Sequence, residues 1–356
     1  ARSVAAKFKV REVIVMTDSN PMRNLYVRLE AAGISESYVR NYILPRWWSD
    51  EIAESSTGFL EAIGYVAKHL GIEPSVLRDE EASLSAQSVA GARFKLRADV
   101  DADDVTWAQS VAVRAGEMAA YATDAPFQLS PEASASSIRN HILESGAKWV
   151  DLEHLLRFCW DSSLPVLHVP EVPGKKMDGM VVSADERPVI VLSKDHSQKA
   201  WLLFILAHEL GHIVEGHLER GDVLVDEEYK PDSSDPCEQE ANQFAVELLS
   251  GDPDFEVGGE LEKAEILAEQ AREFALKYQI APGAAVLNFT HNHPKHPWPL
   301  ANATLKELHP DADAPALIRS NLRENLDWSS LPDESADFLA RVSGIDRSSE
   351  PVPAGS

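Results

Sequence analysis

The sequence lacks the features of a membrane protein and of a secreted, disulfide-bonded one. No apolar run approaches the roughly 18 residues needed to span a bilayer, and the longest candidate runs only from Trp201 to Ala207. The N-terminus has no apolar stretch of the kind that a secretory signal needs. Only two cysteines occur, Cys159 and Cys237, which is typical of a reducing compartment. We therefore expect a cytoplasmic protein that does not engage a membrane.

Positive charge is also scarce. The chain carries 33 lysines and arginines against 58 aspartates and glutamates, a formal net charge of −25. This excess argues against broad, non-specific binding to nucleic acid or to an anionic membrane surface. What the chain has instead is an ordinary globular composition, 44% hydrophobic and 26% charged. With 356 residues, the chain is longer than one hydrophobic core usually accommodates, so we expect two or three compact units.

Turn and proline signals divide the chain into five segments. Short extended runs at 165–169, 179–183 and 188–192 predict a small sheet, and helical patterns surround it. The predicted segments are a flexible arm (1–20), a helical region (21–80), a helical connector (81–130), a mixed domain (131–310) and a C-terminal extension with a disordered tail (311–356).

The helical region contains a helix, a turn at Gly33 and a second helix within residues 24–43, which is the helix-turn-helix arrangement. DNA binding is one interpretation of this pattern. A small helical bundle with solvated arginines explains it equally well. The side chains that give the segment its locally basic character are Arg23, Arg28, Arg40 and Arg46.

The most informative motif is His208-Glu209-Leu210-Gly211-His212, inside a predicted helix over 197–217. Positions four apart lie on one face of a helix, so both imidazoles project together. Zn²⁺ favours such nitrogen ligands at about 2.0–2.1 Å, and His208 and His212 are therefore predicted metal ligands. Glu209 lies about 100° around the helix. It is the predicted general base, because zinc lowers the pKa of bound water to about 7.

A carboxylate from a later helix is the predicted third ligand. Glu238 lies on the apolar face of a helix that begins after Asp235, whereas Glu240 points about 200° away. Glu238 is therefore the predicted ligand, Asn242 the residue that supports it, and Glu240 the less favoured ligand. An alternative is that Glu238, three residues after Asp235, only closes the helix N-terminus.

Three other groups have weaker signals. His217 falls one residue early for a longer three-histidine zinc motif, so it is not a predicted ligand. Cys237 stands at a helix N-terminus beside Glu238, where a thiol of lowered pKa could act as a redox-sensitive regulator. His291, His293 and His296 are expected in a surface loop, because no cysteine or carboxylate completes a metal cluster there.

Together these motifs resemble the ImmA/IrrE family of metallopeptidases. The resemblance rests on residues 208–212 and on Glu238 to Ala245 followed by Leu248-Leu249, and it covers roughly 148–308. The family usually continues with Met-Pro where this chain has Ser250-Gly251, a departure that concerns the substrate cleft. The implied fold class is α+β, with an all-helical N-terminal region followed by a zincin-like domain, a small sheet plus active-site helices.

The same resemblance implies a Zn²⁺-dependent endopeptidase that cleaves a specific protein, typically a helix-turn-helix repressor of the XRE type, in a stress or mobile-element circuit. Some relatives act as the toxin of a toxin–antitoxin pair, and longer relatives carry their own helix-turn-helix segment. A third interpretation is a DNA- or repressor-binding regulator whose metal site is not catalytic.

Overall fold

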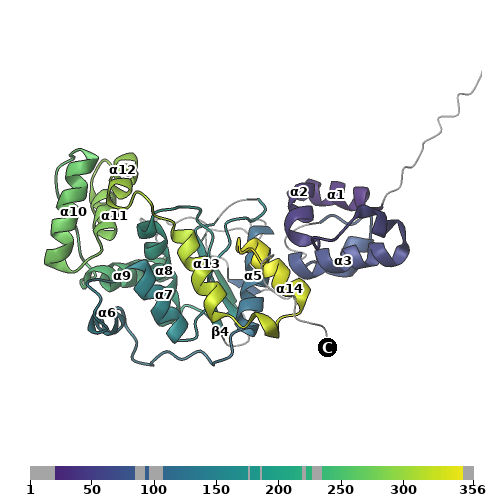
Figure 1. Cartoon of the computed structure of the whole chain (residues 1–356), viewed down its shortest axis with the longest axis horizontal. Coiled ribbons are helices and arrows are strands. Elements are labelled where there is room, and N and C mark those ends of the chain that lie inside the picture. The colour runs from purple at the N-terminus through teal and green to yellow at the C-terminus, as the bar shows by residue number, and fades with distance from the viewer. Residues whose placement is uncertain are drawn as a thin grey trace, which may run out of the picture.

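The computed structural model describes residues 21–84, 93–95, 107–174, 177–184, 187–218, 222–226 and 235–347. The predicted flexible arm and the end of the predicted tail lie outside these residues. Within them the protein consists of helices on both faces of one mixed sheet (Figure 1). This arrangement confirms the predicted α+β class.

Most helices begin and end where the sequence places a capping residue, a proline or a glycine. For example, α3 begins after Ser55, whose hydroxyl accepts the N–H of Gly58, and ends at Gly71 with φ 69°. The helices are α1 (Pro21–Ala31), α2 (Glu36–Tyr38) with the π-helical η1 (Val39–Ile43), the 3₁₀ turn η2 (Asp50–Glu54), α3 (Ser56–Leu70), α4 (Pro74–Arg78), α5 (Trp107–Tyr121), α6 (Ala135–Glu144), α7 (Leu152–Asp161), α8 (Lys199–Val214), α9 (Pro236–Ser250), α10 (Ala264–Tyr278), α11 (Pro282–Asn292), α12 (Trp298–Leu308), α13 (Ala314–Asn325), the 3₁₀ turn η5 (Trp328–Ser330) and α14 (Asp333–Val342).

The sheet has five strands in the order β1-β5-β3-β4-β2. Three of them match the predicted extended runs: β2 (Val166–His168), β3 (Gly179–Ala184) and β4 (Arg187–Leu192). β3 is antiparallel to β4 and to β5 (Asp222–Asp226), whereas β2 runs parallel to β4 and β1 (Arg93–Lys95) runs parallel to β5. The sequence analysis missed β1 and β5. The residues around β1 alternate between polar and apolar side chains, and this signal was overlooked, whereas β5 is only a short apolar run between two aspartates.

The two faces of the sheet belong to two different hydrophobic clusters. On one face α5 packs against β3 and β4, and Val182 belongs to a cluster that continues into the N-terminal helices and α14. On the other face α7, α8 and α13 cover the sheet, where Val181 and Ile190 join a second cluster. A third, smaller cluster lies among α10, α11 and α12. Among the described residues, no helix has both the length and the apolar character that crossing a bilayer requires.

The C-terminal helices are part of these cores. Ile318 of α13 lies in the cluster beneath α8, and Phe338 of α14 lies in the cluster of the N-terminal helices. The Phe338 ring stacks on the His69 ring of α3 with centroids 4.1 Å apart, and Arg341 donates to the backbone carbonyls of Asn41 and Leu44. Within the described residues, α13 and α14 therefore pack into the two large clusters, and α14 connects the end of the described chain with its N-terminal helices.

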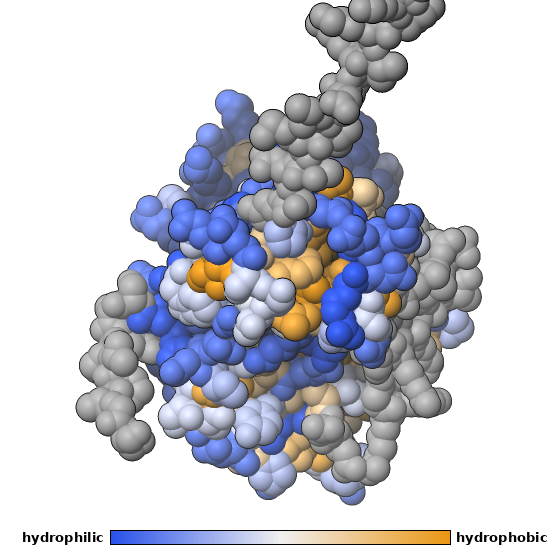
Figure 2. All heavy atoms as spheres, turned by 90° about the vertical axis from the view of Figure 1, so that its right-hand side faces the viewer, coloured by the Kyte–Doolittle hydropathy of each residue, from blue (hydrophilic) through white to orange (hydrophobic). Residues whose placement is uncertain are grey.

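The face formed by the N-terminal helical region is mainly hydrophilic, with apolar side chains reaching the surface between charged ones (Figure 2). Three large hydrophobic residues of this region are more than half exposed, namely Val27, Trp47 and Leu60.

The buried imidazole of His69 predicts a pH-dependent stability. Burial lowers its pKa from 6.5 to about 3, so between these values the unfolded chain binds a proton that the native protein does not. Stability therefore falls as the pH falls below 6.5. Between pH 7 and 5.5 we expect the free energy of unfolding to decrease by about 1–1.5 kcal/mol more than in His69→Gln. Urea titrations at both pH values measure this difference, and equal losses in the two proteins would contradict the assignment.

Candidate metal centre

Two histidines of α8 form the base of the site. The helix is strongly apolar before His208, and its residues Leu202 to Gly211 are nearly all buried between the sheet and α9. His208 and His212 are 4% and 0% exposed. Their Nε2 atoms lie 3.1 Å apart, because side chains one helical turn apart share a face.

Gly211 allows α9 to approach this face closely. A Cβ atom at position 211 would lie 3.1 Å from the Phe244 ring and 3.2 Å from the Ala241 backbone, both in α9. Glycine therefore lets the backbones of α8 and α9 meet one turn after Glu238. Asp235 accepts the N–H of Cys237 at the start of α9, while the Glu238 carboxylate turns to the histidines. A Glu238 that only capped the helix would not contact His208 and His212, as this one does.

The nitrogen and carboxylate oxygen atoms of the three residues lie near the spacing that a tetrahedral zinc ion needs. Glu238 oxygens lie 3.4 Å from His208 Nε2 and 3.5 Å from His212 Nε2. Donors held at about 2.0–2.1 Å around a tetrahedral ion are about 3.3–3.4 Å apart. All three residues are buried, and in the described part of the chain they form the one group with metal-ligand spacing. A buried carboxylate needs a positive partner, so the cluster could hold a divalent cation.

Glu209 lies on the sheet side of α8. It is fully buried, and its carboxylate rests against Gly179 at the start of β3, where a Cβ atom would come within 2.3 Å of Oε1. The missing side chain at position 179 thus provides the space that Glu209 occupies. The sequence analysis singled out Glu209 but not Gly179, whose role depends on how β3 lies against α8.

The other predicted site residues lie around the cluster. Glu240 is exposed and its Oε2 lies 2.9 Å from His217 Nε2, so it contacts a histidine instead of the cluster. Asn242 lines a pocket, and its Oδ1 is buried without a hydrogen-bond partner among the described residues. Cys237 is half-buried and is not a member of the metal-ligand group. His291 lies in α11, not in the expected loop.

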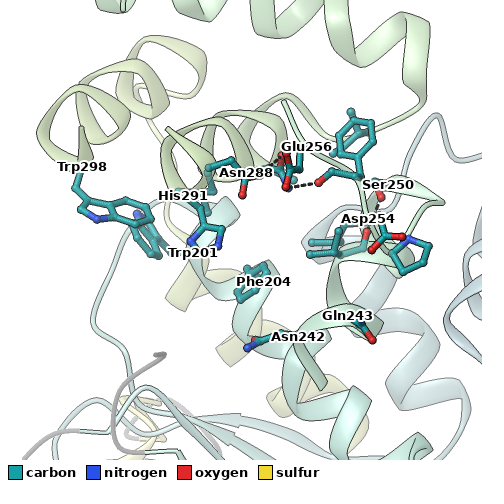
Figure 3. A pocket seen from close by; sticks show the side chains of 18 residues that line it. Trp201, Phe204, Asn242, Gln243, Ser250, Asp254, Glu256, Asn288, His291 and Trp298 are labelled. Carbon is teal, nitrogen blue, oxygen red and sulfur yellow. Dashed lines mark hydrogen bonds between the residues drawn. The ribbon is translucent and has the colours of Figure 1, made fainter. Parts of the chain in front are cut away.

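A pocket begins one helical turn from the cluster. Phe204 precedes His208 by one turn and Asn242 follows Glu238 by one turn, and both line a cavity of about 260 Å³ between α8, α9 and α11 (Figure 3). Its surface is mainly apolar, with Trp201 and Trp298 at one side. Asn288 fixes the loop that borders it, by accepting the N–H of Val257 and donating to the carbonyl of Phe255.

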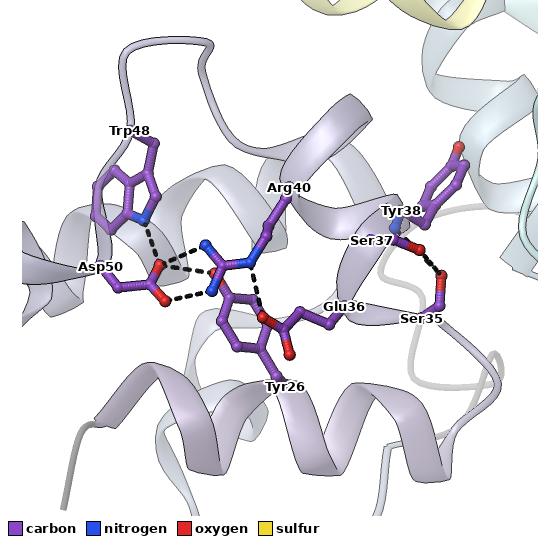
Figure 4. A network of polar contacts seen from close by, with 8 residues as sticks. All are labelled: Tyr26, Ser35, Glu36, Ser37, Tyr38, Arg40, Trp48 and Asp50. Carbon is purple, nitrogen blue, oxygen red and sulfur yellow. Dashed lines mark hydrogen bonds and ion pairs between the residues drawn. The ribbon is translucent and has the colours of Figure 1, made fainter.

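The arginines of the N-terminal region are largely engaged within the protein. Arg40 lies between Glu36 and Asp50, above the ring of Tyr26 (Figure 4). Arg28 donates to the carbonyls of Val76, Leu77 and Ala82. Arg46 is half exposed and lies 3.5 Å from Asp337 of α14, and Arg23 is exposed.

Residues 167–281 match the family model described as the IrrE N-terminal-like domain, a peptidase family. The matched stretch begins in β2 and includes α8 and α9, so it contains all three residues of the cluster. The match supports the resemblance to the ImmA/IrrE family. It also indicates a metallopeptidase-like function for this part of the chain. Neither the search of curated proteins nor that of solved structures gave a significant match.

Metal analysis tests the cluster directly. We expect the protein to bind one Zn²⁺. We also expect His212→Ala or Glu238→Ala to weaken zinc binding by at least about 100-fold, because each substitution removes one ligand atom and leaves only two of the three buried ligands. Competition with a chromophoric chelator gives the affinities. His141→Ala, on an exposed histidine of α6, is the matched control. Full zinc affinity in both cluster variants would exclude this site.

Proposed function

We propose that the chain is a zinc-dependent endopeptidase that cleaves a specific protein partner. The observation that carries the proposal is the buried group of His208, His212 and Glu238 at metal-ligand spacing, with Glu209 adjacent in the sequence. The match of residues 167–281 to a peptidase family supports the same class of reaction.

In this mechanism His208, His212 and Glu238 would hold the ion. When bound there, Zn²⁺ supplies Lewis acidity, which polarises the scissile carbonyl and lowers the pKa of water to about 7. Glu209 takes a proton from the attacking water as the new C–O bond forms. It then delivers the proton to the amide nitrogen as the C–N bond breaks. The carboxylate keeps its position because α8 and Gly179 enclose it.

The pocket beside the cluster supports a polypeptide substrate. It is apolar and begins about one turn, or about 5.4 Å along each helix, from His208 and Glu238. A side chain next to the scissile bond reaches a site at that distance. The pocket therefore suits a large apolar side chain next to the cleaved bond. Such side chains are common in the hydrophobic core of a protein substrate.

The proposed partner is a transcriptional repressor of the XRE type, as the family resemblance implies. A protein partner also agrees with the charge of the N-terminal region, where residues 21–84 contain ten acidic side chains against six lysines and arginines. Phosphate backbones bind surfaces with the opposite balance. We therefore favour protein recognition over DNA recognition for this region.

The variant Glu209→Gln tests the mechanism. It keeps the shape of the side chain but cannot accept the proton, so we expect cleavage to fall by about 10²–10⁴-fold with zinc affinity unchanged. The assay uses a purified repressor of the XRE type as substrate, with products identified by mass spectrometry. Undiminished cleavage by this variant would remove Glu209 from the mechanism, and intact repressor with the wild-type protein would remove the proposed substrate.

The variant Gly179→Ala tests the space that Glu209 occupies. The added methyl group displaces the Glu209 carboxylate, since its position lies 2.3 Å from Oε1. A shift of about 1 Å at a catalytic group costs on the order of 100-fold in rate. We expect that loss in kcat with little change in zinc affinity. Ser183→Ala, on the same strand, is the control, and an active Gly179→Ala enzyme would show that this contact is dispensable.

A further inference from the structure

The end of α8 brings a third histidine back to the cluster. Gly216 has φ 74°, a left-handed conformation that glycine adopts without strain. The N–H of His217 then bonds to the carbonyl of His212 at 3.0 Å. This is the Schellman ending of a helix, in which the residue after the glycine folds back on the residue five positions earlier.

The side chains of the same two residues are also joined. His217 Nδ1 lies 2.9 Å from His212 Nδ1, and His217 Nε2 lies 2.9 Å from Glu240 Oε2. His212 and His217 are buried, whereas the side chain of Glu240 is 59% exposed. A continuous hydrogen-bonded chain therefore runs from the metal-ligand group through His217 to a carboxylate at the surface.

The proton positions in this chain follow from its two ends. Ionised Glu240 can only accept, so His217 Nε2 carries the proton between them. In neutral His217 the other nitrogen, Nδ1, is then an acceptor, and His212 Nδ1 must be the donor. This leaves His212 Nε2 without a proton, with its lone pair on the side where His208 Nε2 and Glu238 lie. The chain thus selects the tautomer of His212 that a metal ion needs.

We propose that His217, held by Glu240, is a positioning residue that orients His212 and fixes its tautomer for metal binding. The inference rests on the proposed function, because it assigns a role toward the same metal. His217 itself is not a ligand, since its Nδ1 faces His212 and its Nε2 faces Glu240. Glu240 acts only through His217.

Zinc affinity, measured by chelator competition, is the first test. Partners that orient a ligand contribute about 10–100-fold to metal affinity, and we expect a loss in this range for His217→Ala. His217→Asn places an amide oxygen near the position of Nδ1, so it keeps the acceptor for His212 and should retain affinity within a few-fold. His217→Gln places its amide near the position of Nε2, toward Glu240, and should resemble His217→Ala.

A double-mutant cycle tests the dependence of Glu240 on His217. Glu240→Ala alone should weaken zinc binding several-fold, and the double variant Glu240→Ala/His217→Ala should bind no more weakly than His217→Ala. Glu215→Ala is the matched control, because it removes an equal charge from an exposed position near the end of α8. Independent, additive losses would show that Glu240 acts through its charge alone.

Nitrogen NMR of the metal-free protein gives a reading that does not depend on activity. His212 should carry its proton on Nδ1 in the wild type and lose this preference in His217→Ala. Unchanged zinc affinity and an unchanged tautomer in His217→Ala would overturn the inference while leaving the proposed endopeptidase intact. A wild-type protein that binds no zinc would overturn both.

Discussion

The close approach of α8 and α9 at Gly211 is the constraint on which the site depends. The three candidate ligands come from two helices that are separated in sequence, and Gly211 leaves no side chain between the helix backbones where α8 approaches Ala241. A Cβ atom at position 211 would lie 3.2 Å from the Ala241 backbone, so α9 or the Phe244 ring would have to give by a few tenths of an ångström. Interiors are densely packed and absorb such shifts only at a cost, so the packing of these two helices and the geometry of the candidate metal centre are linked.

The candidate metal site is a polar group buried between the sheet and α9. Two imidazoles, the Glu209 carboxylate and the Glu238 carboxylate lie inside an otherwise apolar cluster, where an uncompensated charge costs several kcal/mol. The sheet lies on one side of the histidines and α9 on the other, and a mainly apolar pocket lies one helical turn from the cluster. The exposed end of the network, at Glu240, connects the group with solvent.

Local patterns predicted the parts of the structure that depend on local chemistry. The spacing of His208 and His212, the apolar face that carries Glu238 and the capping by Asp235 are all properties of single helices, and the extended runs of β2, β3 and β4 are strongly apolar. Tertiary pairing decides the rest. β1 and β5 exist because each lies beside another strand, and Gly179 matters only because β3 passes beneath Glu209. The sequence did contain a signal for His217. A glycine directly before it, at position 216, favours a helix ending that folds His217 back onto His212, but the sequence analysis considered His217 only as a metal ligand.

The stacking of His69 on Phe338 joins α3 to the last helix of the described chain, and this affects the order of folding during synthesis. The first helices leave the ribosome long before α14, which contributes Phe338 and Leu339 to the same cluster. At translation rates of about 5–20 residues per second, the interval between His69 and Phe338 is roughly 10–50 s. For that time the nascent N-terminal region lacks the Phe338 ring that covers His69, which makes it a candidate for chaperone binding.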